Sequence, residues 1–177
     1  ASEAADHKAG EGTGMKKLLL FAAAVLAAGL LGWLPATQRD VGTLLPVQTL
    51  ILSIRDGELV LEGGEGLRGT GGSWNEAMAD LRATAPGDAF FGSTGQIILV
   101  DRAAALLEDV LGDPSLRPAA RIYAGTGEPD PESATAYLDA HRSGITLQSL
   151  QAAALEGRET RLPLLVCREG RYWLKDG

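Results

Sequence analysis

Two glycine-rich patterns are the most specific candidates for chemistry in this sequence. The Gly-Glu-Gly-Leu-Arg-Gly stretch at 64–69 matches the G-x-G-x-x-G pattern that places a dinucleotide pyrophosphate at a helix N-terminus. The next predicted helix begins only at Ser73, and the acidic residue about twenty positions on, Asp88, falls in a predicted Pro-Gly loop. Residues 66–73 resemble a P-loop, but Gly72 stands where the phosphate-binding Lys is required. Both patterns therefore predict a glycine-rich loop.

Five single side chains that could do chemistry favour structural roles. His141 is predicted near a helix C-terminus, where the helix dipole stabilises a cationic imidazole, and Ser143 has no acid at motif spacing. Cys167 lies in an apolar run and is predicted to be a small core residue. Trp74 and Tyr137 fall at helical spacing, which predicts packing in the core before any part in a pocket.

The composition excludes several classes of function. One Cys and two His exclude an intrachain disulfide framework and make a His- or Cys-based metal centre improbable. A net charge of −7 and an aromatic content of 5% argue against a nucleic-acid partner. Acidic residues are scattered, and only a pair assembled by the fold would suit acid–base catalysis. We therefore predict no enzymatic activity and no catalytic, cofactor-binding or metal-ligating residue, and leave the identity of any small-molecule ligand open.

The N-terminal part of the chain carries a targeting pattern. Residues 1–14 are small and polar, which predicts a disordered leader or tag. Two lysines then precede the uncharged run 18–34, whose 17 residues span about 26 Å as a helix. Residues 15–36 are therefore predicted to be a signal peptide or membrane anchor helix that delivers residues 37–177 out of the cytoplasm. Leu34 stands where a cleavage site needs a small residue, which slightly favours a retained anchor.

The remaining chain reads as a single α/β (α+β) domain. Apolar runs at 47–54 and 59–61 flank an Asp-Gly turn, and runs at 162–167 and 172–174 flank a Glu-Gly turn, so a β-hairpin is predicted at each end. The continuously apolar run 96–100 predicts a strand that is buried on both faces, and Phe90-Phe91-Gly92 before it predicts packing. Together with a strand at 120–124 and about four helices, this pattern predicts a mixed sheet flanked by helices.

The predicted helices are marked by their ends. Ser73 with Glu76 three residues later forms a capping box, and Pro86-Gly87 ends that helix. Asp101 is predicted to cap a helix that stops at residue 112. The last two helices are predicted to begin after Asp130, which precedes a Pro, and after Thr146. The stretch between the first hairpin and Ser73, residues 63–72, is predicted to be a loop.

The order of four segments resembles a known family. After the apolar leader come Gln-Arg-Asp at 38–40, Ser-Trp-Asn-Glu-Ala at 73–77, the run Phe-Phe-Gly-Ser-Thr-Gly before the 96–100 strand, and Asp-Pro-Ser-Leu-Arg-Pro at 113–118. This order resembles the N-terminal domain of the Ger(x)C family, the C subunit of spore germinant receptors, over residues 38–124. The chain departs from the family pattern at the lipobox Cys, where Trp33 stands.

The resemblance implies an anchored, non-enzymatic protein. Members of the family lie on the outer face of the spore inner membrane and work with integral membrane subunits. We therefore expect a membrane-tethered extracytoplasmic binding or scaffold domain that is a component or accessory of a germinant receptor complex. Two alternatives remain: an exported solute-binding domain, which predicts an apolar pocket of several hundred Å³, and an exported hydrolase, which predicts two buried carboxyl groups with raised pKa values in one cleft.

Overall fold

The computed structural model describes residues 44–175. The leader or tag at 1–14 and the signal peptide or anchor at 15–36 lie outside the described residues. Within 44–175, no helix combines the length and the apolar character that crossing a bilayer needs. The described residues belong to one compact unit.

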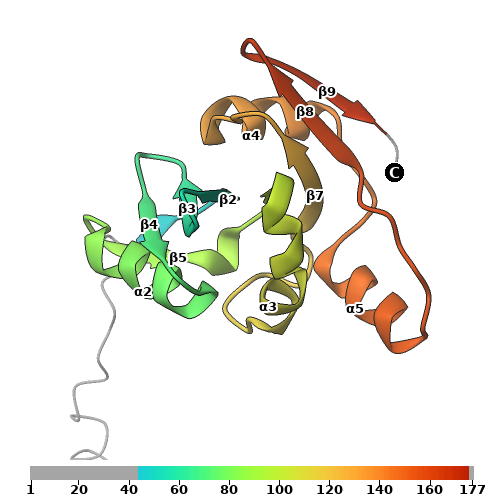
Figure 1. Cartoon of the computed structure of the whole chain (residues 1–177), viewed down its shortest axis with the longest axis horizontal. Helices are drawn as coiled ribbons and strands as arrows, with labels where there is room; N and C mark the ends of the chain where they lie inside the picture. The colour runs from blue at the N-terminus through green and yellow to red at the C-terminus, as the bar shows by residue number, and fades with distance from the viewer. Residues whose placement is uncertain (1–43, 176–177) are drawn as a thin grey trace, which may run out of the picture. The chain divides into compact units, whose positions relative to one another are not determined.

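A seven-stranded mixed sheet forms the centre of this unit, as the sequence predicts (Figure 1). Its order is β4-β3-β2-β6-β7-β8-β9. Strands β2, β6, β7 and β8 are parallel, and β3, β4 and β9 are antiparallel to their neighbours. The strand bounds are β2 Thr49–Arg55, β3 Glu58–Gly63, β4 Arg68–Gly71, β6 Gln96–Val100, β7 Arg121–Thr126, β8 Leu164–Arg168 and β9 Arg171–Lys175. A second, two-stranded parallel ribbon pairs β1 (Leu44–Pro46) with β5 (Asp88–Phe90).

The helices cover the two sides of the sheet unequally. One side carries α2 (Trp74–Thr84), α3 (Leu107–Gly112) and α5 (Leu147–Leu155), which pack with the larger apolar cluster. The other side carries α4 (Pro131–Ala140), whose Ala134 and Leu138 pack on Ile51, Ile98 and Tyr123 (Figure 1). This second side therefore has one helix for seven strands, which leaves part of the sheet available to line a site.

Both predicted hairpins are confirmed, and their turns explain why. Asp56 and Gly57 join β2 to β3 with φ values of 55° and 87°, and Glu169 and Gly170 join β8 to β9 with φ values of 51° and 71°. Two successive residues at positive φ define the type I′ turn, which matches the twist of an antiparallel pair. The strand at 96–100 is also confirmed, because all five of its residues are buried in the middle of the sheet.

The predicted glycine-rich loop at 63–72 is wrong, because it contains β4. The glycines of this strand allow α2 to lie directly on the main chain. A Cβ atom at Gly69 would stand 2.3 Å from the Ala77 carbonyl oxygen, and one at Gly71 would stand 2.6 Å from the Ala77 nitrogen. β-Branched and aromatic side chains usually indicate a strand in a sequence. In β4 the glycines have no side chain, and this absence allows α2 to pack on the strand. Asp88, predicted in a loop, likewise lies in β5.

Two helix starts differ from the prediction in detail. Ser73 caps α2 by accepting from the Glu76 N–H at 3.3 Å, but the Glu76 carboxylate accepts from Gly72, not from Ser73, so the reciprocal box is half formed. Asp101 does not cap a helix: it is the first residue of the 3₁₀ helix η3 (Asp101–Leu106), with φ at 48°. Asp130 and Thr146 cap α4 and α5 as predicted.

Helix side chains accept hydrogen bonds from main-chain N–H groups on both edge strands of the sheet. On β4, the Thr70 N–H donates to the Asp80 carboxylate of α2 at 2.8 Å. On β9, the Leu174 N–H donates to the Tyr137 hydroxyl of α4 at 3.1 Å. An edge strand with open donors is a template for pairing with another chain, so both contacts limit that pairing.

Candidate functional site

The structure assigns packing roles to the motif residues of the sequence. The glycines at 64–69 divide between a turn, where Gly66 has a φ of 73°, and β4, where α2 covers Gly69. The α2 amides that a phosphate would need follow Ser73, which already caps them. His141 ends α4, where its Nδ1 lies 2.9 Å from the Tyr137 carbonyl and its ring stacks on that of Tyr137.

Two further predictions about single residues have different outcomes. Trp74 is confirmed as core, with 5% of its surface exposed, while Tyr137 is half-buried beside the α4-side cluster. Cys167 is half-buried on β8 and not in the core, and its thiol lies 3.4 Å from the Glu128 carbonyl oxygen. The apolar run around Cys167 misled the prediction because this strand lies beside an edge strand.

The three described segments that carry the family resemblance meet in one cluster. Trp74 donates its indole N–H to the Asp113 carboxylate at 2.9 Å, and Asp113 also accepts from the main chain and hydroxyl of Ser115. Arg82 donates to the Ser115 hydroxyl at 3.2 Å and lies over the ring of Phe91, 5.2 Å from its centroid. The cluster joins α2 to the segments at 90–100 and 113–120, so these separated motifs stabilise one packing arrangement.

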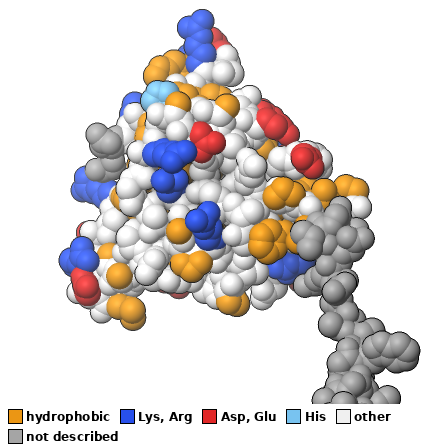
Figure 2. Space-filling model, turned by 180° about the vertical axis from the view of Figure 1, so that it is seen from behind, with side chains coloured by type: hydrophobic (Ala, Val, Ile, Leu, Met, Phe, Trp, Pro, Cys, Tyr) orange, Lys and Arg blue, Asp and Glu red, His pale blue; other side chains and the backbone are white. Residues whose placement is uncertain are grey.

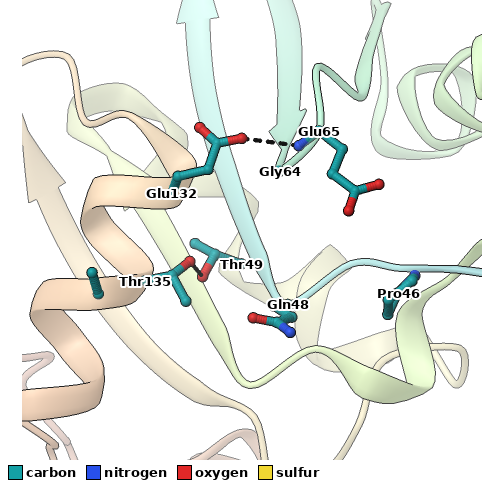
Figure 3. Close-up of a pocket in the computed structure, with 8 residues that line it drawn as sticks. Pro46, Gln48, Thr49, Gly64, Glu65, Glu132 and Thr135 are labelled. Atoms are coloured by element: carbon teal, nitrogen blue, oxygen red, sulfur yellow. Dashed lines mark hydrogen bonds between the residues drawn. The ribbon is translucent and has the colours of Figure 1, made fainter.

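A first hollow, the amino-end hollow, lies beside the start of β2 and has a volume of about 310 Å³ (Figure 3). Its lining includes Gln48 and Thr49 from the sheet, Gly64 and Glu65 from the turn after β3, and Glu132 and Thr135 from α4. Glu132 accepts from the Glu65 N–H at 3.0 Å, as the dashed line in Figure 3 marks.

The buried polar side chains beside this hollow bond to one another. The Thr49 hydroxyl donates to the Gln96 amide oxygen at 2.8 Å and lies within hydrogen-bond distance of the Thr135 hydroxyl. Gln96 donates its amide N–H to Asp139 at 3.0 Å. These bonds hold α4 against the amino ends of β2 and β6. The amino-end hollow therefore lies at a packing contact between α4 and the sheet.

A second hollow, the carboxyl-end hollow, lies at the opposite ends of the same strands and has a volume of about 370 Å³. Its lining comprises Ile51, residues 53–55 at the end of β2, residues 100–102 after β6 and residues 127–129 after β7. Ligands of open α/β sheets bind outside the carboxyl ends of parallel strands. A third hollow shares Arg55, Glu128 and Pro129 with this one and Glu132 with the amino-end hollow.

Most polar side chains of the carboxyl-end hollow have no side-chain partner in the described part of the chain. Ser53 is 7% exposed, and its hydroxyl has no hydrogen-bond partner among the described residues. Asp101, Arg102 and Glu128 are exposed, and no side-chain bond joins any of them to another residue within 44–175. Arg55 is the exception, because it forms a 3.0 Å ion pair with Glu62 on β3.

Strain in the backbone marks the same place. Asp101 adopts a left-handed conformation, φ 48°, in the residue that directly follows the buried strand β6. Non-glycine residues in this region cost on the order of 1 kcal/mol or more, and they gather at functional sites. Gly127, with φ at 84°, lets the loop after β7 pass the main chain of Cys167 where a Cβ atom would collide with its carbonyl oxygen.

The carboxyl groups with shifted pKa values lie elsewhere and shift downward. Burial alone would raise the pKa of Asp113, but hydrogen bonds from Ser115 and Trp74 outweigh it and hold that pKa below its usual value. The Ser133 main-chain N–H lowers the pKa of Asp130 at the α4 N-terminus. The hydrolase alternative needs two buried acids with raised pKa values in one cleft, and these groups within 44–175 give it no support.

The solute-binding alternative agrees with the structure in the volume of the hollow but not in its lining. The carboxyl-end hollow has the predicted volume, but charged and polar side chains line much of it, where the prediction asked for an apolar lining. Ser53 is the residue that the sequence analysis missed. The available signal was a hydroxyl residue, Ser53, that interrupts the apolar residues 50–54 of the predicted strand.

Comparisons with protein-family models, curated proteins and solved structures return no match for this chain.

Proposed function

We propose that the chain is a membrane-tethered extracytoplasmic binding domain that acts as a component or accessory of a germinant-receptor-like complex. The observation that carries this proposal is the cluster of Trp74, Asp113, Ser115, Arg82 and Phe91. It joins the three described segments whose order resembles the Ger(x)C N-terminal domain. A chance likeness between short motifs gives no reason for those motifs to pack against one another, whereas a shared fold does.

Exposed apolar side chains offer the contacts that such a domain needs. Phe90 on β5 and Trp173 on β9 are each 45% exposed, and Leu155 at the end of α5 is 90% exposed. On the face that Figure 2 shows, apolar side chains form small separate groups among charged ones. Apolar groups rimmed by charge suit contacts with a protein partner, and tethering to a membrane raises their effective concentration near integral partners.

The test is site-specific crosslinking in the cells that make the protein. A photoreactive amino acid replaces Phe90 or Trp173 in the full chain, and the matched control replaces Glu58 at the β2–β3 turn. We expect the full chain in the membrane fraction, with crosslinks from Phe90 or Trp173 to multi-pass membrane proteins of the germinant receptor type. Deleting the gene should slow germination of the spores, measured by their loss of optical density.

Two results would contradict the proposal. One is recovery of the intact chain from the cytosol without detergent. The other is a crosslinking pattern at Phe90 and Trp173 that equals that of the Glu58 control, combined with normal germination of the deletion strain.

A further inference from the structure

We propose that the carboxyl-end hollow binds a small molecule that carries a primary ammonium group and, a few bonds away, a hydrogen-bonding group. This inference goes beyond the proposed function and does not depend on it, because it rests on the side chains of the hollow alone. The ammonium group meets Asp101 and Glu128, and the hydrogen-bonding group reaches Ser53 at the buried end of the hollow.

The charge of the lining selects a cation. Asp101 and Glu128 line the hollow without a side-chain partner among the described residues. Of the two guanidinium groups in the lining, that of Arg55 already forms an ion pair with Glu62, which lies outside the lining. Within residues 44–175, the lining therefore holds two carboxylates and one guanidinium, that of Arg102, that have no side-chain partner. The net charge of −7 on the whole chain adds to the attraction of a cation.

Ser53 supplies the second, independent observation. A buried hydroxyl without a partner destabilises the fold, and native structures seldom leave one. Ser53 is more than nine-tenths buried, lines this hollow and leaves its hydroxyl unbonded within 44–175. A ligand that donates to or accepts from this hydroxyl removes that cost, which makes the position specific for a polar group.

The amino-end hollow shows that these features are not general to this side of the sheet. There the buried Thr49 and Gln96 bond to each other and to α4. The volume of about 370 Å³ at the carboxyl end lies at the lower end of the range for small-molecule sites. A compact amine fits such a volume better than a nucleotide.

Four probes with the same number of carbon atoms test separately whether the hollow recognises an ammonium group, a hydroxyl group or a carboxylate. They are 4-amino-1-butanol, butylamine, 1,4-butanediol and butyrate, each titrated by calorimetry into the full chain held in a non-ionic detergent. We expect 4-amino-1-butanol to bind most tightly and butylamine about tenfold more weakly, since it lacks the group that reaches Ser53. The uncharged diol and the anion should give no saturable heat.

Matched variants locate the binding. Asp101→Asn should weaken 4-amino-1-butanol about tenfold or more, and Glu128→Gln should act in the same direction. Asp56→Asn is the control, because Asp56 is also an exposed aspartate with a left-handed φ, 55°, but lies in the β2–β3 turn outside the lining. Asn tolerates this conformation, so both backbones are expected to persist, which circular dichroism checks.

Ser53→Ala gives the sharpest readout. It should abolish the preference for 4-amino-1-butanol over butylamine while leaving butylamine binding unchanged. The proposal is overturned if the amines give no saturable heat, if butyrate binds as tightly as they do, or if Asp101→Asn and Asp56→Asn have equal effects. Equal binding of the two amines to the unmodified chain would overturn the role given to Ser53.

Discussion

The two ends of the parallel strands differ in whether their buried polar side chains have hydrogen-bond partners. At the amino ends, Thr49 and Gln96 bond to each other, and Gln96 reaches Asp139 on α4. At the carboxyl ends of the same strands, Ser53 is buried without a partner and Asp101 is held in a left-handed conformation. α4, the helix on this side, bonds to the amino ends through Thr135 and Asp139.

This difference separates architecture from a candidate site. A polar group whose bonds are all satisfied inside the protein fixes one packing and offers little to a ligand. A buried group with an open bond destabilises the fold, so its presence needs another reason. We therefore expect the polar groups at the amino ends to stabilise the fold and those at the carboxyl ends to serve the proposed binding. Substitutions of Gln96 and Ser53 test this difference, and a substitution of Asp113 tests a bonded carboxylate outside both ends.

The largest expected effect lies at the amino ends. Gln96→Ala removes the acceptor of Thr49 and the donor to Asp139, and it leaves the Thr49 hydroxyl to rely on Thr135. Lost bonds and a new cavity should lower the free energy of unfolding by about 2–3 kcal/mol, measured by urea denaturation. Gln148→Ala, on the exposed face of α5, is the control and should change it little. An equal loss in both variants would show that the amino-end network does not stabilise the fold.

A smaller effect is expected for a carboxylate whose bonds are satisfied. The pKa of Asp113 lies below its usual value of 3.8 in the folded state, so its stabilising contribution is full above about pH 4. That contribution is lost as the pH falls from 4 toward the lower folded pKa. Asp113→Asn should therefore flatten the pH dependence of stability between pH 5 and 2 relative to Asp56→Asn, measured by thermal unfolding. Identical slopes in the two variants would contradict this account.

The smallest effect should have the opposite sign. Ser53→Ala removes a buried hydroxyl that has no partner within the described residues, so the free energy of unfolding should rise by up to about 1 kcal/mol. Ser115→Ala, which removes a hydroxyl bonded to Asp113 and Arg82, is the matched control and should lower it by about 1 kcal/mol. A stability loss at Ser53 of the size seen at Ser115 would mean that Ser53 has a structural role.

The sequence predicts the fold better than the site, for a physical reason. Turn residues such as Asp56 and Gly57 act locally, so both hairpins and the caps of three helices are visible in the chain itself. β4 was missed because Gly69 and Gly71 are required by contact with a helix, and that contact is not local.

The carboxyl-end hollow was missed for a related reason. Ser53, Asp101 and Glu128 come from three separate elements, and only the parallel register of β2, β6 and β7 brings them to one edge. No spacing in the sequence records that proximity. The left-handed φ of Asp101 is also invisible in the sequence, where an aspartate after a strand predicts an ordinary cap.

The occupied donors on the edge strands bear on how neighbouring copies of the chain can pair. Asp80 occupies a donor of β4 and Tyr137 occupies one of β9. A neighbouring copy that meets either edge strand finds one main-chain donor fewer to pair with, which disfavours edge-to-edge growth into fibres.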